Sequence, residues 1–329
     1  MMTRRNFLAA GGGLAAAALG SADAARAEAP AAARTAVALV KDADRATAIP
    51  RALALLGANP VHGKRVLIKP NFNTADPFPA STHNDTLAAL AGELRRMGAA
   101  GIALGERCGP PKTGEVLRDK GIPELCRRLD VGLINFEELP PGEWVRVRPP
   151  GSHWLDGFDV AKPVLDAEAV VSTCCLKTHA YGGVFTMSLK LSVGLTHKRN
   201  MVELHGSFRS MRKMIAELNL AYRPALILMD GTDVFTDGGP ASGTLRHAGV
   251  VLAGTDRIAV DAVGLAVLKE LGSNSAIMDT PIFRQEQIAR AVELGLGIGG
   301  PGGIELRADD AASRAYASRL RTILEREAA

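Results

Sequence analysis

A strand–helix–strand pattern in the first third of the chain constrains the fold most strongly. Residues 65–70 form a short apolar run that ends at Pro70, and residues 84–97 show helical periodicity that stops at Gly98. A second apolar run follows at residues 101–106. Two strands joined by a helical crossover are expected to pair in parallel, whereas an antiparallel pair needs only a short turn. The pattern therefore predicts a parallel sheet that is covered by helices.

Further apolar runs extend this pattern along the chain. Strands are expected at residues 132–136, 170–176 and 225–230, with a glycine-rich loop at residues 231–243 and a helix at residues 281–294. With 47% hydrophobic residues, the chain can bury a sizeable core. We predict an α/β fold with a mainly parallel sheet and helices on both faces, built as one domain or as two closely joined lobes.

Residues 140–166 interrupt the alternation of strands and helices. They are rich in Pro and Gly, and residues 143–148 alternate between apolar and charged side chains. This pattern is typical of a half-exposed β-ribbon, so we predict a ribbon insertion in a domain that spans residues 28–308. A polar helix at residues 309–329 is expected to follow the domain.

The first 27 residues have the composition of an export signal. Arg4 and Arg5 form a twin-arginine pattern, an apolar run covers residues 8–19, and residues 25–27 fit a cleavage site. A membrane anchor is the alternative, but the run is shorter than the roughly 20 residues that cross a bilayer. We therefore expect the twin-arginine translocase to deliver the chain to the periplasm or outside the cell, with no stable membrane anchor after cleavage.

The charge balance does not indicate a polyanionic partner. The formal net charge of +4 includes three arginines and one aspartate of the predicted signal, so about +2 remains on residues 28–329. Proteins that bind nucleic acids usually carry a stronger basic excess on one face. We therefore expect no nucleic-acid partner.

The four cysteines do not form a metal-cluster pattern. Cys108, Cys126, Cys174 and Cys175 contain no C-x-x-C pair, so an iron–sulfur cluster is not expected. In an oxidising compartment, a Cys108–Cys126 disulfide is one alternative. The adjacent pair is expected to be part of a buried strand.

Charged side chains end three of the predicted strands. Lys69, Lys177 and Asp230 each follow an apolar run, and Lys177 begins the stretch with the densest reactive side chains, which includes His179 and Lys190. Because ligands bind at the carboxyl ends of parallel strands, we expect these three groups to converge on one crevice. Two lysines beside glycine-rich loops suit a small anion with a carboxylate or phosphate group. A solvated sheet edge is the alternative.

The residue types suggest separate roles in this crevice. Lys69 and Lys177 bind the anion, His179 moves a proton, and a buried Lys190 serves as a base or forms a Schiff base. Alternatively, Lys190 pairs with Asp230 or Asp261. The predicted catalytic residues are Lys177, His179, Lys190 and Asp230. The predicted substrate-binding residues are Lys69, Asn71, Asn73, Asp237, Gly238 and Gly239.

No cofactor is named by the sequence, but a divalent metal is an alternative. His179, His197 and His205 are candidate ligands, with Asp233 and Asp237 as a weaker oxygen-rich set. The histidine spacings match no compact zinc motif such as H-E-x-x-H. Exposed histidines in polar loops are the simpler interpretation.

Six motifs occur in a fixed order along residues 64–306. They are V-L-I-K-P-N at 66–71, L-K-T-H at 176–179, S-L-K-L-S-V-G-L at 188–195, L-M-D-G at 228–231, G-G-P-A-S-G at 238–243 and A-G-T-D-R-I-A-V-D-A at 253–262. With His205, they resemble the domain-of-unknown-function 362 family.

This resemblance implies a fold rather than an activity. Many family members carry an appended ferredoxin-like domain, whose cysteines this chain lacks. Where the family usually has K-N, this chain has Lys190-Leu191, so a polar role of that amide is lost. In architecture the family resembles the nickel-pincer hydroxyacid racemases, a likeness that assigns no reaction.

Two functional hypotheses follow from these residues. The first is an exported enzyme that acts on a small anionic substrate. The second is a non-catalytic accessory or binding protein of a periplasmic metal or redox pathway, suggested by the export signal and the adjacent cysteines. A structural partner protein is a third and weaker alternative, because the polar glycine-rich loops do not predict a large apolar interface.

Overall fold

The structure is a computed structural model that describes residues 34–327, so the predicted signal at residues 1–27 lies outside the described residues. Its strands are β1 (Thr35–Val40), β2 (Arg65–Lys69), β3 (Gly101–Glu106), β4 (Gly132–Asn135), β5 (Trp144–Val147), β6 (Phe158–Ala161), β7 (Ala169–His179), β8 (Val184–Thr186), β9 (Pro224–Gly238), β10 (Gly243–Gly254) and β11 (Ile304–Arg307).

Most strands join one nine-stranded sheet in the order β11-β1-β10-β9-β7-β2-β3-β4, with β8 paired to β7. Strands β9, β7, β2, β3 and β4 are mutually parallel, and β1 is parallel to β11. Strand β10 is antiparallel to both of its neighbours. The predicted mainly parallel sheet is thus confirmed.

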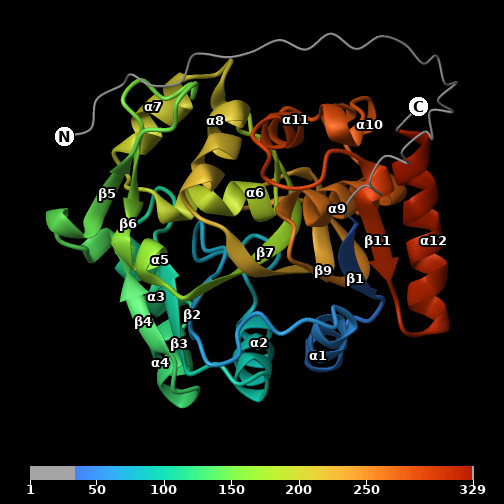
Figure 1. Ribbon diagram of the computed structural model, residues 1–329, viewed down its shortest axis with the longest axis horizontal. Coiled ribbons are helices and arrows are strands. Elements are labelled where there is room, and N and C mark those ends of the chain that lie inside the picture. The colour runs from blue at the N-terminus through green and yellow to red at the C-terminus, as the bar shows by residue number, and fades with distance from the viewer. Residues whose placement is uncertain (1–33, 328–329) are drawn as a thin grey trace, which may run out of the picture. The chain divides into compact units, whose positions relative to one another are not determined.

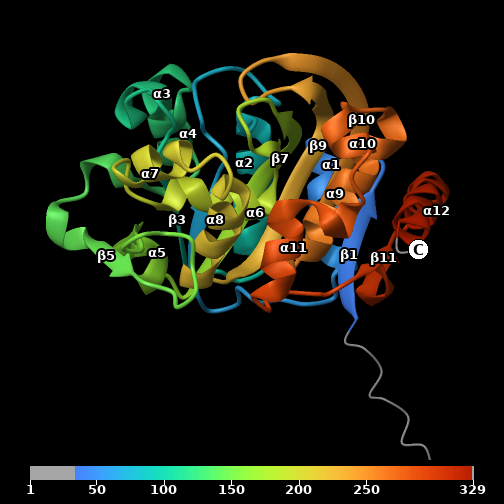
Figure 2. The ribbon, with the colours of Figure 1, turned by 90° about the horizontal axis from the view of Figure 1, so that it is seen from above.

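Helices cover both faces of the sheet (Figures 1 and 2). Both faces need this cover because both are apolar. In β2, for example, Val66 and Ile68 contribute to one apolar core, and Leu67 contributes to another core on the opposite face. The first face holds α1 (Arg45–Leu55), α2 (Asn84–Arg96), α3 (Thr113–Asp119) and α4 (Ile122–Arg128). The second holds α6 (Ser188–Leu191), α8 (Met211–Leu218), α9 (Arg257–Leu271) and α11 (Glu286–Glu293).

Helix α9 is the central helix of the second face. Its side chains are buried on almost every side, as expected for a helix without a polar stripe. Asp256 caps its first turn by accepting hydrogen bonds from the backbone N–H groups of Ile258 and Ala259, at 2.8 and 3.0 Å. The helix therefore provides a rigid support for α6, which packs against it.

Residues 231–243 are not the predicted loop. Strand β9 continues to Gly238 and forms a hairpin with β10, so only residues 239–242 make the turn. The glycines and aspartates of this segment suggested a loop, but Thr232, Val234 and Thr236 alternate with them and are buried in the extended strand.

The C-terminal part contains shorter helices than predicted. The expected helix at 281–294 is divided into a short 3₁₀ helix (Ile282–Arg284) and α11, while α10 (Ser275–Met278) precedes them. Helix α12 (Ala311–Arg326) packs on α9 and β11. Within residues 34–327, no helix combines the length and apolar character that crossing a bilayer requires.

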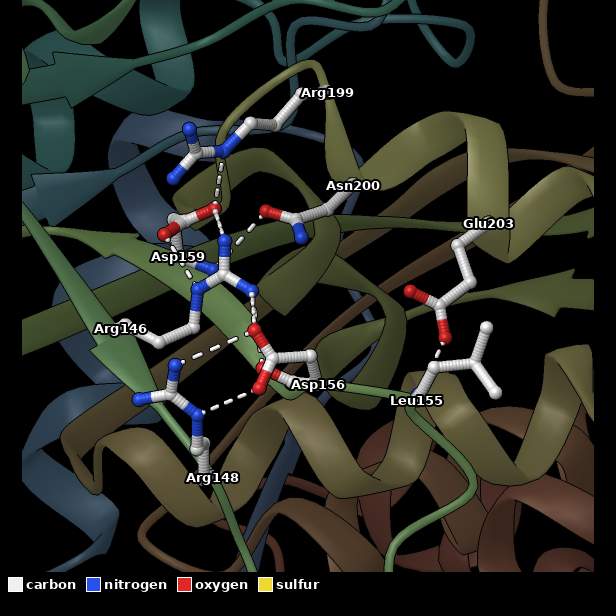
Figure 3. Close-up of polar contacts among 8 residues, drawn as sticks. All are labelled: Arg146, Arg148, Leu155, Asp156, Asp159, Arg199, Asn200 and Glu203. Carbon is white, nitrogen blue, oxygen red and sulfur yellow. Dashed lines mark hydrogen bonds and ion pairs between the residues drawn. The ribbon is translucent and has the colours of Figure 1, made fainter.

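The ribbon β5–β6 lies within the predicted insertion and is followed by α5 (Lys162–Asp166). It is tied to α7 (Asn200–Gly206) and the preceding loop (Figure 3). Asp159 binds Arg146 and Arg199 through its two oxygens, at 2.8 and 2.6 Å. Its backbone N–H donates to the side chain of Asn200 at 3.0 Å. The ribbon thereby fixes the position of α7.

Candidate functional site

A cavity of about 640 Å³ opens at the carboxyl ends of β2, β3 and β7. This volume is within the range of pockets that bind organic ligands. The walls come from the segments after these strands, from α6 with the following 3₁₀ turn (Ser192–Leu195), from α7 and from the β9–β10 turn. The cavity lies at the edge of the sheet that the sequence predicted as a binding site.

A buried ion pair forms one wall of the cavity. Lys69 Nζ lies 2.5 Å from Glu106 Oε1, and both side chains are 1% exposed. Glu106 also accepts hydrogen bonds from the backbone N–H groups of Phe72 and Arg107, at 2.8 and 2.9 Å. Burial lowers the pKa of Lys69 and raises the pKa of Glu106, although their contact opposes both shifts. The charge of Lys69 is therefore already compensated within the protein.

Gly194 is necessary for this wall. A Cβ atom at Gly194 would lie 2.7 Å from Lys69 Nζ and 2.8 Å from Glu106 Oε1, closer than nonbonded atoms approach. Gly109 has a similar relationship to Asn73, whose Oδ1 would lie 2.2 Å from an added Cβ. Both glycines allow the backbone to pack directly against polar side chains of the cavity.

Two other cations of the cavity also have partners. The buried guanidinium of Arg107 donates to the carbonyl oxygens of Thr196 and Cys108, each at 2.8 Å, and also to that of Val193. Lys198 Nζ lies 2.6 Å from Glu137 Oε1. These contacts hold the wall together and satisfy the N–H donors of Arg107, while Glu137 compensates the charge of Lys198.

Lys190 differs from these cations. Its ammonium group has no hydrogen bond or ion pair with any residue in 34–327, and its partly buried side chain lines the cavity. Burial, followed by repulsion from Lys177 and Arg107, lowers the pKa of Lys190 to about 8. Both forms of this amine are therefore populated near neutral pH.

Asp261 of α9 fixes the helix that carries Lys190. Its two oxygens accept hydrogen bonds from the backbone N–H groups of Ser188 and Leu189, at 2.7 and 2.9 Å, at the start of α6. Burial raises the pKa of Asp261 to about 7, although these two hydrogen bonds act in the opposite direction. Neither Asp230 nor Asp261 pairs with Lys190, in contrast to the alternative considered from the sequence.

His179 lies beside Lys190 at the end of β7. An added Cβ at Gly183 would lie 3.0 Å from both His179 Nδ1 and Lys190 Cε, so both side chains pack against the glycine. Burial, followed by the charges of Lys190 and Lys177, lowers the pKa of His179 to about 2. The imidazole is therefore neutral and weakly basic in the ligand-free protein, and the role of His179 in moving a proton stays a prediction.

Three buried polar atoms of residues that line the cavity have no hydrogen-bond partner among residues 34–327. They are Asn71 Oδ1, His179 Nδ1 and Thr186 Oγ1. A buried polar atom without a partner costs about 1–3 kcal/mol, so native proteins rarely retain several in one place. Their grouping around one cavity makes it the candidate binding site for a polar ligand.

The outer wall of the cavity includes His205 and Met201 of α7. His205 donates a hydrogen bond from Nδ1 to the carbonyl oxygen of Met201 at 2.8 Å. This contact leaves the other ring nitrogen, Nε2, open. As Figure 3 shows, the ribbon holds this helix from outside, where Glu203 accepts a hydrogen bond from the Leu155 N–H at 2.7 Å.

The structure brings only some of the predicted site residues together. Those that line the cavity are Lys69, Asn71, Asn73, His179, Lys190 and His205. Strands β9, β7 and β2 are neighbours as expected, yet Lys177 and Asp230 point to the α1–α2 face. Lys177 Nζ donates to the carbonyl oxygen of Pro79 at 2.9 Å and to that of Ala80.

Asp230 is fully engaged on that face. Its carboxylate pairs with Arg45 of α1 at 2.7 Å and accepts a hydrogen bond from Thr86 of α2 at 2.5 Å. The expected convergence of Lys69, Lys177 and Asp230 is therefore corrected. Lys69 lines the cavity, whereas Lys177 and Asp230 lie within longer strands and face the other side, where Asp230 links the sheet to two helices.

Residues 237–239 do not line the cavity either. Asp237 accepts a hydrogen bond from Asn274 at 3.0 Å, outside the site. Gly238 and Gly239 have φ angles of +77° and +78°, as the hairpin turn requires. The following Pro240 and Ala241 reach the cavity in their place.

The candidate metal ligands are not assembled into a cluster. Across residues 34–327, no group of three or more His, Cys, Asp or Glu side chains is placed to hold a metal ion. His197 packs edge-on against Trp144, with ring centroids 4.7 Å apart, and its Nδ1 accepts the Arg199 N–H at 3.0 Å. Asp233 pairs instead with His247 at the surface.

All four cysteines are buried free thiols, with no Cys108–Cys126 disulfide in the structure. Burial raises the pKa of Cys108 to about 12 and that of Cys126 to about 11. Burial also raises the pKa values of Cys174 and Cys175. Protonated thiols of this kind act as packing groups rather than as nucleophiles.

Several cavity residues were not identified from the sequence. Glu106 ends an apolar strand as Lys69 does, so the same criterion of a charged strand end would have found it. Arg107, Thr186 and Gly194 carry no comparable local signal, because their importance depends on contacts between distant segments.

Comparisons with known proteins agree with the motif analysis. No curated protein matches the sequence. Among solved structures, the chain is similar to the lactate racemase apoprotein from Thermoanaerobacterium thermosaccharolyticum, with 15% identity and a TM-score of 0.45. The match covers 68% of this chain and 54% of the racemase, so the chain spans about half of its length. The family model described as "Domain of unknown function (DUF362)" matches residues 66–266, which is more than half of the chain, and the chain therefore belongs to this family.

Proposed function

We propose that the protein is an enzyme that binds a small organic anion, with a carboxylate or phosphate group, in the cavity beside α6. The observation that carries this proposal is the unpaired Lys190 ammonium group, which faces a cavity whose other cations have partners. A partly buried cation without a counter-ion has lost part of its hydration, and a bound anion offsets that cost.

The unpartnered atoms support a ligand with several polar groups. Asn71, His179 and Thr186 supply a carbonyl oxygen, a ring nitrogen and a hydroxyl group that can complete a ligand's hydrogen bonds. Apolar side chains such as Leu191, Val193 and Met201 line the same space. This mixture favours an organic body with an acidic group over a bare inorganic ion.

Catalysis rather than simple binding is supported by the amine itself. A pKa of about 8 allows Lys190 to exchange a proton, or to form a bond, near neutral pH. The second candidate function is non-catalytic binding of the same anions. The weak basicity of His179 favours this alternative, because it removes one expected proton acceptor.

A ligand panel tests the proposal on the full chain. Acetate, lactate, citrate and inorganic phosphate are added to the wild type and to Lys190→Met, which removes the charge at similar volume. Lys64→Met is the matched control, because Lys64 is exposed and outside the cavity. We expect at least one anion to raise the Tm of the wild type and the control, but not that of Lys190→Met. No response to any anion, or equal responses in all three proteins, would contradict the proposal.

We also propose export through the twin-arginine translocase, supported by Arg4, Arg5 and the apolar run that follows. The double substitution Arg4→Lys and Arg5→Lys tests this, with Arg26→Lys as the control. The double variant is expected to accumulate as an uncleaved cytoplasmic precursor. Unchanged export of the double variant would rule out this route.

A further inference from the structure

Three lysines lie in the protein interior near the sheet edge, and their partners distinguish them. Lys69 pairs with Glu106, and Lys177 donates to the Pro79 carbonyl oxygen at 2.9 Å. Both are almost fully buried, as expected for structural lysines with satisfied ammonium groups. Lys190 has no such partner in residues 34–327, and its side chain lines the cavity. Its amine is therefore free to react with a ligand.

From this contrast we propose that Lys190 forms a reversible imine with a carbonyl group of the bound anion. The ligand class is then 2-oxo acids and organic acids or phosphates that carry an aldehyde. The inference rests on the proposed function, because it requires an anion in the same cavity. It goes further by naming the second functional group of the ligand and the bond that it forms.

The surroundings of Lys190 prevent it from becoming a structural ion pair. Asp261 is the acidic side chain that contacts α6, and both of its oxygens accept backbone hydrogen bonds from Ser188 and Leu189. Glu106, the acid in the cavity wall, pairs with Lys69. His179 lies near the Lys190 side chain, and the charges that act on Lys190 from further away are the cations Lys177 and Arg107. Within residues 34–327, no carboxylate pairs with the Lys190 amine to hold it in its protonated form.

The backbone around Lys190 is positioned for a defined reaction geometry. Asp261 holds the first turn of α6, while Asn219 donates to the carbonyl oxygen of Leu189 at 2.9 Å. Gly183 leaves room for the Lys190 chain, since an added Cβ would lie 3.0 Å from Lys190 Cε. These contacts hold the backbone at Lys190 in place, so its flexible side chain extends into the cavity from a fixed position.

Electrostatics support the nucleophilic role. With a pKa of about 8, roughly half of the Lys190 amine is unprotonated at pH 8, compared with about 0.3% for an amine at the ordinary value of 10.5. Only the unprotonated amine has the lone pair that attacks a carbonyl carbon. The cavity also attracts the carboxylate of an oxo acid through its excess of basic side chains.

The proposed reaction needs no other reactant. The Lys190 nitrogen attacks the carbonyl carbon to form a C–N bond, and the C=O π bond becomes a hydroxyl group as one proton moves from nitrogen to oxygen. The resulting carbinolamine then loses this hydroxyl group together with the remaining N–H proton as water. The product is a C=N bond, and addition of water reverses every step.

Reductive trapping tests the inference. The full chain is incubated with pyruvate or glyoxylate and sodium cyanoborohydride, and the intact mass and the modified peptide are measured. We expect one adduct, with the mass of the oxo acid less one oxygen atom, on Lys190. Labelling of Lys190 should exceed that of the exposed Lys64 by about tenfold or more, because the cavity holds the oxo acid beside Lys190 and Lys64 lies outside it.

Two controls separate nucleophilic attack from anion binding. Lys190→Arg keeps a cation but lacks a primary amine, so it should still respond to lactate by thermal shift and form no adduct. Lactate has the carboxylate of pyruvate without its carbonyl group, so it should form no adduct with the wild type. The wild-type peptide map remains decisive if the variant does not fold.

The outcomes distinguish this inference from the proposed function. If lactate and pyruvate raise the Tm but trapping labels Lys64 as much as Lys190, or labels neither, the imine is contradicted and anion binding stands. If no anion raises the Tm and no adduct forms, both proposals are contradicted. A single adduct on Lys190 supports both.

Discussion

Asp261 accepts a hydrogen bond from the backbone N–H of Ser188 at 2.7 Å, and this contact joins two helices that are more than 70 residues apart in the sequence. The other oxygen of Asp261 accepts from Leu189, so the carboxylate caps the first turn of α6. Lys190 is the next residue. The position of the proposed ligand-binding amine therefore depends on a carboxylate that does not line the cavity.

Asp261→Asn tests this dependence. An amide keeps the volume but places an NH₂ group against one of the two N–H donors, so one buried hydrogen bond is lost. We expect a loss of about 1–3 kcal/mol in the free energy of unfolding, measured with urea, and a weaker Tm response to anions. Asp261→Glu should restore part of that response. An unchanged anion response in a destabilised Asp261→Asn would show that the cap does not position Lys190.

Lys190→Met should stabilise the ligand-free protein at pH 7. The substitution removes a partly buried cation without a partner, so we expect a gain of about 1–3 kcal/mol in the free energy of unfolding. Lys64→Met is expected to leave stability nearly unchanged, because Lys64 is exposed. A clear loss of stability in Lys190→Met would mean that the amine has a stabilising partner.

The pH dependence of stability should report the same amine. The pKa of Lys190 is about 8 in the folded protein, against an ordinary value of 10.5. Between these values the unfolded chain binds more protons, so the Lys190 contribution makes the folded state more stable as pH rises from about 8 to 10.5. The difference in stability between Lys190→Met and the wild type should therefore shrink over this range. A constant difference would contradict the shifted pKa.

Gly183→Ala should disturb the packing of His179 and Lys190 against residue 183. The added methyl group would lie 3.0 Å from atoms of both side chains, so one of them must move. We expect a cost of about 1–3 kcal/mol and a weaker anion response. Gly92→Ala is the matched control, because an added Cβ meets nothing within 4 Å in α2 and should stabilise the helix. Wild-type anion binding in Gly183→Ala would show that this clearance has no functional role.

Glu106→Gln should strongly destabilise the protein. It leaves the buried Lys69 ammonium group without a counter-ion, which typically costs about 3–5 kcal/mol. Adding Lys69→Met removes the uncompensated charge, so the double variant should recover part of the lost stability in urea unfolding. Equal stability of the single and double variants would show that the two side chains are not coupled.

The sequence predicted the strands and the edge of the sheet where the cavity lies, because short apolar runs and strand-ending polar residues are local signals. Lys69 was found in this way, and His179 and Lys190 were found from the density of reactive side chains around them; all three line the cavity. Lys177 and Asp230 were misplaced, because a charged strand end does not reveal which face of the sheet its side chain joins.

Long-range contacts explain what the sequence did not predict. Residues 231–238 continue a strand because β10 pairs with them. Their glycines and aspartates are typical of a loop, and no local sequence pattern counteracts that signal. Asp261 caps α6 only because the Ser188 N–H lies within hydrogen-bond distance. Position 194 requires glycine only because the Lys69–Glu106 pair lies directly against it. Such relationships arise only when distant segments pack together.

The titration of the Lys190 amine by NMR, in protein labelled with ¹³C at the lysine side chains, tests the central claim most directly. The Lys190→Met spectrum assigns the signal. We predict a pKa of about 8 for Lys190 in the ligand-free protein and a higher value when a non-carbonyl anion such as lactate is bound, because a neighbouring negative charge favours the ammonium form. A pKa near the ordinary 10.5, unchanged by any anion, would contradict the account of Lys190 as an unpaired amine that binds the ligand.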